Sequence, residues 1–111
     1  MKFIPMDQNE NLEYLDEESN ITYLIRPIIG EIEIQSQDLM IKLRETTDNI
    51  TAMKLIDELF DLFVVGWRST KKIADFPSDG HPSKLFPFAF KNEMVNISYR
   101  LNTLTDDEKK T

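Results

Sequence analysis

The sequence predicts an α+β fold, in which a small antiparallel β-sheet from the N-terminal half packs against two main helices from the C-terminal half. Up to residue 35, apolar and polar residues alternate in short segments, as in half-buried strands. From residue 50 onward, apolar residues recur at spacings of three and four, as on the buried face of a helix. A length of 111 residues suits one domain. We place this domain at residues 1–104 and expect residues 105–111 to form a polar, frayed tail.

The first strands are predicted from short apolar segments that end in turn residues. Residues 2–5 and 12–15 are two such segments, and a polar turn cluster follows each of them. Residues 21–29 are rich in β-branched and aromatic side chains and give the strongest strand signal. Pro27 cannot donate a ladder hydrogen bond, so we expect this strand to lie at a sheet edge or to bend at the proline.

A further strand is predicted at residues 31–35, where Ile32 and Ile34 would point inward and the polar residues between them outward. Gly30 allows a turn or bulge before it. The two segments on either side of this glycine are therefore expected to pair as a hairpin that is wet on one side. Residues 36–45 suit either a strand or the start of a helix.

The first predicted helix begins after the candidate N-cap residues 46–49. Gly66 is placed to end it as the C′ residue, whose left-handed conformation glycine adopts without strain. Trp67 would then fold back on the last turn. An exposed Trp67 that anchors a partner is the alternative. The buried stripe of this helix is predicted to contain Ile50, Met53, Ile56, Leu59, Phe60, Phe63 and Val64.

A long loop at residues 68–84 is followed by a run of alternating phenylalanines, Phe86, Phe88 and Phe90. Pro87 favours an extended chain here. We expect the phenylalanines to pack across the core, and an exposed patch covered by a partner is the alternative. A second helix is predicted at residues 91–101, and its apolar face contains Met94, Ile97, Ser98, Leu101 and Leu104.

Composition and charge argue against several classes of protein. The chain has a net charge of −7, and residues 1–50 hold the whole acidic excess, so binding to a phosphate backbone is not expected. It contains no cysteine, which excludes disulfides and thiolate chemistry. We find neither a signal-peptide pattern nor an apolar stretch of about 18 residues, so we expect a cytoplasmic protein that does not cross a membrane.

No group of residues predicts an enzyme. The lone histidine, His81, stands in a turn without a local signature of a Ser-His-Asp arrangement. Glu58 and Asp61 lie one helical turn apart, but such a pair is usually a solvated face rather than a cation site. We therefore predict no catalytic, cofactor-binding or metal-binding residues. The partner-contact candidates are Trp67, Phe86, Phe88 and Phe90.

Three segments resemble parts of small bacteriophage tail-morphogenesis proteins. The first is Ile21-Thr22-Tyr23-Leu24-Ile25-Arg26-Pro27-Ile28-Ile29-Gly30-Glu31. The second starts with Phe63-Val64-Val65-Gly66-Trp67-Arg68 and continues through Gly80 and Pro82 to Phe86. The third is Ile97-Ser98-Tyr99-Arg100-Leu101-Asn102-Thr103-Leu104-Thr105-Asp106-Asp107-Glu108-Lys109-Lys110. Together they cover less than half of the chain.

The resemblance implies a tail assembly chaperone that binds tape-measure or tail-tube subunits in the host cytoplasm, without a cofactor. Contact through an exposed hairpin edge, by addition of a partner strand, is a further route. The alternatives are a minor virion structural protein, such as a head–tail connector or a homo-oligomeric tail ring component, and a small metal-dependent regulator. Neither nucleic acid nor a membrane is an expected partner.

Overall fold

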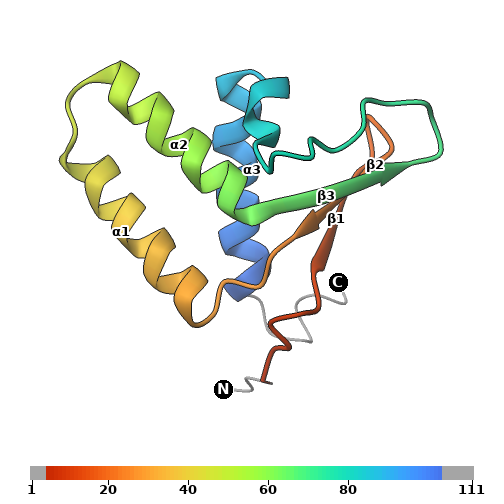
Figure 1. Ribbon diagram of the computed structural model, residues 1–111, viewed down its shortest axis with the longest axis horizontal. Coiled ribbons are helices and arrows are strands. Elements are labelled where there is room, and N and C mark those ends of the chain that lie inside the picture. Colours follow the sequence, from red (N-terminus) through yellow and green to blue (C-terminus); the bar gives the residue numbers. More distant parts are fainter. Residues whose placement is uncertain (1–4, 104–111) are drawn as a thin grey trace.

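The computed structural model of the protein describes residues 5–103, which form a three-stranded sheet covered by helices on one face (Figure 1). The strands are β1 (Leu12–Asp16), β2 (Ile21–Ile25) and β3 (Val64–Ser69). The helices are α1 (Glu31–Glu45), α2 (Asn49–Phe63) and α3 (Phe88–Thr103), and a short 3-10 helix, η1 (Pro82–Leu85), precedes α3. The predicted α+β class is confirmed. Three predictions lie outside the described residues: the tail at residues 105–111, the position of Leu104 and, apart from its last residue, the strand at residues 2–5.

The sheet is antiparallel, with the order β1-β2-β3. Tyr23 of the central strand pairs with Tyr14 on one side and with Trp67 on the other. The β1–β2 turn is closed by a hydrogen bond from the Asn20 backbone amide to the Asp16 carbonyl, at 2.8 Å. β2 is the central strand of the sheet, so the predicted edge position is wrong. The strand ends at Ile25, two residues before Pro27, so the proline follows the end of a central strand and does not interrupt its ladder.

Residues 31–35 form the start of helix α1, so the predicted strand and its hairpin with residues 21–29 are wrong. Gly30 adopts a φ of 58°, and the helix begins directly after it. Acidic residues occupy the first turn of α1 and basic residues its last turn, which suits the helix macrodipole. Positions two apart lie about 200° apart around a helix. Ile32 therefore packs against the core, whereas Ile34 points into solvent.

Helix α2 begins at the predicted place, because the Asp48 side chain accepts a hydrogen bond from the Thr51 backbone amide at 2.9 Å. The predicted stripe is buried from its middle onward, at Ile56, Leu59, Phe60 and Phe63. Val64 was expected on the same helix but is the buried first residue of β3. Ile50 and Met53 were expected to be buried but are 64% and 45% exposed. The first turns of α2 project to the left in Figure 1, away from the sheet, which explains this difference.

Gly66 lies inside β3 and does not end a helix, so the prediction of a C′ glycine followed by a folded-back Trp67 is wrong. The β-branched Val64 and Val65 favour a strand directly after α2. Glycine suits this position because the Leu24 side chain covers it: a Cβ atom on Gly66 would lie 3.0 Å from Leu24 Cδ1.

Helix α3 confirms the second predicted helix and begins three residues earlier than expected. Met94, Ile97 and Ser98 are buried, as predicted. Near its C-terminal end, Asn102 Oδ1 accepts a hydrogen bond from the Ile28 backbone amide at 2.7 Å. The Asn102 amide group also donates to the Arg26 carbonyl. The end of α3 is thereby joined to the segment between β2 and α1.

Candidate protein-interaction surface

Trp67, the first of the predicted contact residues, is partly buried among other aromatic side chains. Its ring meets those of Phe76 and Phe86 edge-on, at centroid distances of 4.9 and 5.5 Å. Its indole Nε1 donates a hydrogen bond to the Ala74 carbonyl at 2.9 Å. The Trp67 side chain therefore joins the sheet to the loop that follows β3.

The three phenylalanines do not form an extended strip, because α3 begins at Phe88. Phe86 and Phe90 stack on each other, with centroids 4.6 Å apart, and both contact Phe60 and Tyr23. Phe88 is 38% exposed, and Leu85, three positions earlier in the sequence, is 48% exposed. Phe88 and Phe90 lie about 200° apart around α3, so Phe90 packs inward and Phe88 outward, whereas Phe86 packs inward from the segment before the helix.

A small apolar pocket of about 140 Å³ opens beside this aromatic cluster. Its lining includes Trp67, Leu85 and Phe86, together with Tyr23 from the sheet. Burial raises the pKa of the Tyr23 hydroxyl above its ordinary value. This volume is about half of the roughly 300 Å³ at the lower end of the range for drug-sized ligands, so the pocket suits no more than a single side chain.

Asp61 on α2 holds the segment that leads into η1. Its Oδ1 accepts a hydrogen bond from the Ser83 backbone amide, and its Oδ2 accepts one from the Ser83 hydroxyl, both at 2.8 Å. His81 Nδ1 lies 3.2 Å from the same Oδ2. Asp61 was expected on a solvated face, and nothing in the sequence connects it with Ser83.

The Asp61, His81 and Ser83 side chains do not form a catalytic relay. In such a relay the imidazole lies between the hydroxyl and the carboxylate and takes the hydroxyl proton. Here the Ser83 hydroxyl donates directly to the carboxylate, and Ser83 is buried. The arrangement caps η1 and fixes the loop on α2.

Among the described residues, no group of three or more histidine, cysteine, aspartate or glutamate side chains is arranged to hold a metal ion. Glu58, which was paired with Asp61 in the sequence, is exposed and separate from the Asp61 hydrogen bonds. The metal-dependent alternative therefore gains no candidate centre from residues 5–103.

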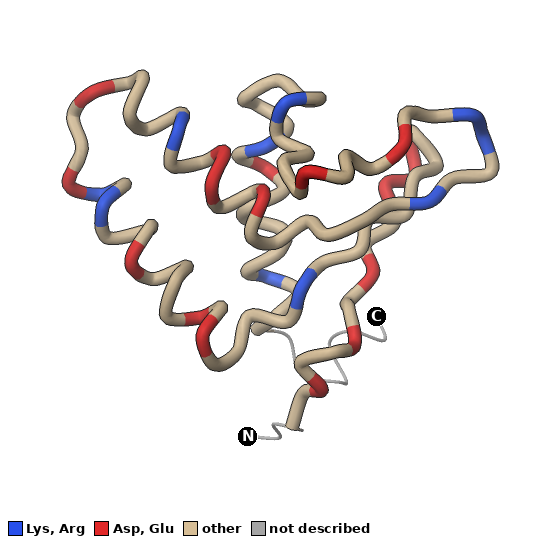
Figure 2. Tube along the Cα trace, viewed as in Figure 1, with Lys and Arg blue, Asp and Glu red and all other residues tan. Residues whose placement is uncertain are grey.

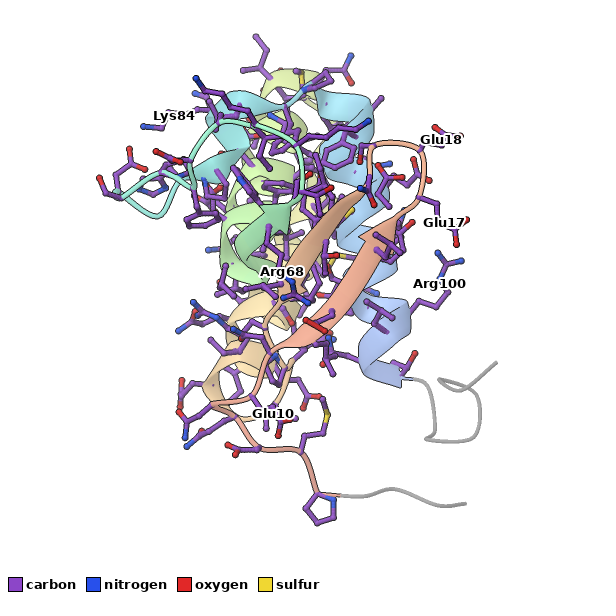
Figure 3. All side chains as sticks on the ribbon, turned by 90° about the vertical axis from the view of Figure 1, so that its right-hand side faces the viewer. Glu10, Glu17, Glu18, Arg68, Lys84 and Arg100 are labelled. Carbon is purple, nitrogen blue, oxygen red and sulfur yellow. The ribbon has the colours of Figure 1, made fainter. Side chains whose placement is uncertain are left out.

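Charged residues of both signs are spread along the described chain, with no long segment of one sign (Figure 2). Most acidic residues of the first half of the chain lie in the β1–β2 hairpin and in α1. The sequence assigned this half to the sheet, so the expectation that the acidic residues lie in a β half is wrong. The segment after β3 is basic and contains Lys71 and Lys72. Arg68 of β3 forms an ion pair with Glu13 of β1 across the face of the sheet that the helices leave open. This open face is the one turned toward the viewer in Figure 3.

Four large apolar side chains on the α1–α2 hairpin are exposed, and the two on α1 are contact candidates that the sequence did not predict. Ile34 and Ile41 on α1 are 63% and 47% exposed. Ile50 and Met53 lie on the first turns of α2. The available signal was the spacing of seven between Ile34 and Ile41, which places two apolar residues on one helical face once residues 31–45 are known to be a helix.

No protein-family model matches the chain, and neither the curated proteins nor the solved structures include a significant match to it. Within residues 5–103, the helices are too short and too polar to cross a membrane.

Proposed function

We propose that the protein is a non-enzymatic interaction factor whose main contact surface is the outer face of α1. The observation that carries this proposal is the exposure of Ile34 and Ile41 on a helix that also has a buried apolar face. Residues seven apart lie about two turns, or 10.5 Å, apart along nearly the same line. Ile32, Leu39 and Leu43 pack toward the core on the opposite side.

A helix that is apolar on two sides is typical of a helix buried on two sides. Core packing explains only the inner side of α1. The outer side carries the two isoleucines within a charged surface that includes the Asp38–Lys42 ion pair, at 3.0 Å. An apolar line of this kind fits a groove or a second helix on another protein, where the anchors repeat at i and i+7.

The specific role that we propose is that of a phage tail assembly chaperone, with a tape-measure or tail-tube subunit as the partner. The resemblance of three segments to tail-morphogenesis proteins supports this role. The net charge of −7 also supports it, because a charged shell keeps a complex with an aggregation-prone subunit in solution. The exposed isoleucines supply the apolar contact that such a complex needs.

Co-expression with the tape-measure and tail-tube proteins of the same genome tests this proposal. We expect one of them to co-purify with the chain. Replacement of both Ile34 and Ile41 by glutamine should abolish co-purification without unfolding the protein, because both side chains are exposed and glutamine is a good helix former. Ile50→Gln is the matched control, since it removes an equally exposed isoleucine from α2.

The alternative role, a ring-forming component of the virion, is favoured by one observation. Each subunit of a ring needs two different contact surfaces. Leu85 at the end of η1 and Phe88 at the start of α3 are further exposed apolar side chains, away from α1 in the sequence. Mass spectrometry of purified particles separates the two roles. A ring component is present at a fixed number of copies per particle, whereas a chaperone is absent.

A further inference from the structure

A groove of about 540 Å³ runs between the edge of the sheet and helix α3. Tyr14, Leu15 and Asp16 of β1 form one wall. The other wall belongs to α3, where the apolar residues are Phe90, Met94 and Ile97. The groove therefore has a strand backbone along one side and a helix along the other.

β1 has a partner strand on one side only. It pairs with β2 along its whole length, and no other described strand pairs with its outer edge. The residues of β1 include neither a lysine nor a proline, and the irregular pairing in the sheet lies between β2 and β3. A lysine, a proline or an irregular pairing normally helps to prevent an edge strand from pairing with another chain, and β1 has none of these three.

The rim of the groove is strongly acidic. Asp16, Glu17 and Glu18 line it at the turn of the hairpin, and Glu93 lines it on α3. Arg100 lies three positions after Ile97 on α3, and Figure 3 shows it on the same side of the molecule as Glu17 and Glu18. The end near the hairpin turn is thus the more negative one, and it suits basic side chains.

We infer that this groove binds an extended basic peptide segment of another protein, which adds as a fourth strand to the edge of β1. Backbone hydrogen bonds to β1 hold the segment, while alternate apolar side chains face Phe90, Met94 and Ile97. Lysine or arginine side chains contact the acidic rim. The inference does not depend on the proposed role of α1, because it concerns a different surface and a different kind of partner.

A capped seven-residue peptide of alternating lysine and valine is the probe for this site. We expect it to bind the full chain and to slow the hydrogen exchange of backbone amides in β1. A peptide of alternating glutamate and valine should not bind. Two further lysine–valine peptides carry N-methyl groups, one at all valine amides and the other at all lysine amides. The peptide whose methyl groups face β1 should fail to bind, because it cannot complete the ladder.

Two charge-reversed proteins separate a local site from general attraction. In the groove variant, Glu17→Lys and Glu93→Lys together should weaken binding about tenfold, as expected for two lost ion pairs and two new repulsions. In the control variant, Glu45→Lys and Glu58→Lys change the net charge equally on α1 and α2. All four side chains are exposed, so both variants should fold. Both variants change the net charge of the protein by the same amount, and salt screens the effect of distant charges. We therefore expect the control to bind the peptide within about twofold of the native protein.

Five results would overturn the inference. The first four are the absence of binding, equal weakening in both variants, tight binding of both methylated peptides, and protection only of amides outside β1 and α3. Protection of β1 in the free protein that grows with its concentration would also overturn it, because two copies of the chain would then occupy each other's edge.

Discussion

Asp61 joins two segments of the chain that are far apart in sequence. Its carboxylate comes from the last turn of α2 and accepts two hydrogen bonds from Ser83 in η1. The backbone amide and hydroxyl of Ser83 would otherwise be buried without a partner. The sequence could not show this contact, because the two residues are 22 positions apart in segments without a shared pattern.

Asp61→Ala tests how much this contact stabilises the fold. We expect a loss of about 1–3 kcal/mol in the free energy of unfolding, since two buried polar groups lose a charged acceptor. Urea denaturation measures the loss. Glu58→Ala, an exposed change on the same helix, should alter stability far less. Equal effects of the two substitutions would contradict the structural role of Asp61.

Asp48 gives a pH-dependent prediction. Hydrogen bonds from the Thr51 hydroxyl and backbone amide lower the pKa of the Asp48 carboxyl below its ordinary value. A lowered folded-state pKa means that the carboxylate stabilises the fold above its unfolded pKa of about 3.9, and that this contribution is lost as pH falls through the folded-state pKa.

Asp48→Asn keeps a side-chain acceptor at the N-cap but does not titrate. We therefore expect any stability advantage of the native protein over this variant to shrink as the pH falls from about 5 through the unfolded pKa of about 3.9 and on through the lower folded-state pKa. Chemical denaturation at a series of pH values measures this difference. A difference that stays constant over the range would show that Asp48 ionisation is not linked to folding.

At the scale of elements, helices and strands were predictable where one periodicity extended over a whole element. The central part of α2 and most of α3 carry such a stripe, and their predicted positions are correct. Residues 31–35 alternate over a span too short to distinguish a strand from the first turn of a helix. The acidic first turn after Gly30 was the better signal.

Gly30→Ala tests the start of α1. Gly30 has a φ of 58° and a ψ of −130°, a conformation that side chains with a Cβ atom disfavour. An added Cβ atom would meet no other atom within 4 Å, so the cost comes from the backbone alone. We expect a loss of about 1–3 kcal/mol in urea denaturation. Gln37→Ala, at an exposed position within α1, should be neutral or slightly stabilising.

At the scale of the whole molecule, the helices cover one face of the sheet and leave other surfaces open to partners (Figure 1). The sequence predicted the α+β class, which the structure confirms. The four aromatic contact candidates stay a prediction. The sequence did not predict which surfaces are exposed, because exposure depends on how α1, α2 and the aromatic cluster pack together. Trp67, Phe86 and Phe90 are largely occupied by one another, whereas Ile34 and Ile41 face outward.

Hydrogen exchange on the complex with a co-expressed tape-measure or tail-tube subunit tests the central claim most directly. The amides of α1 around Ile34 and Ile41 should exchange more slowly in the complex than in the free protein, because a bound partner suppresses local opening of a helix at the molecular surface. Protection that appears only in β3 and around residues 86–90, with α1 unchanged, would contradict the claim and return the contact site to the aromatic residues.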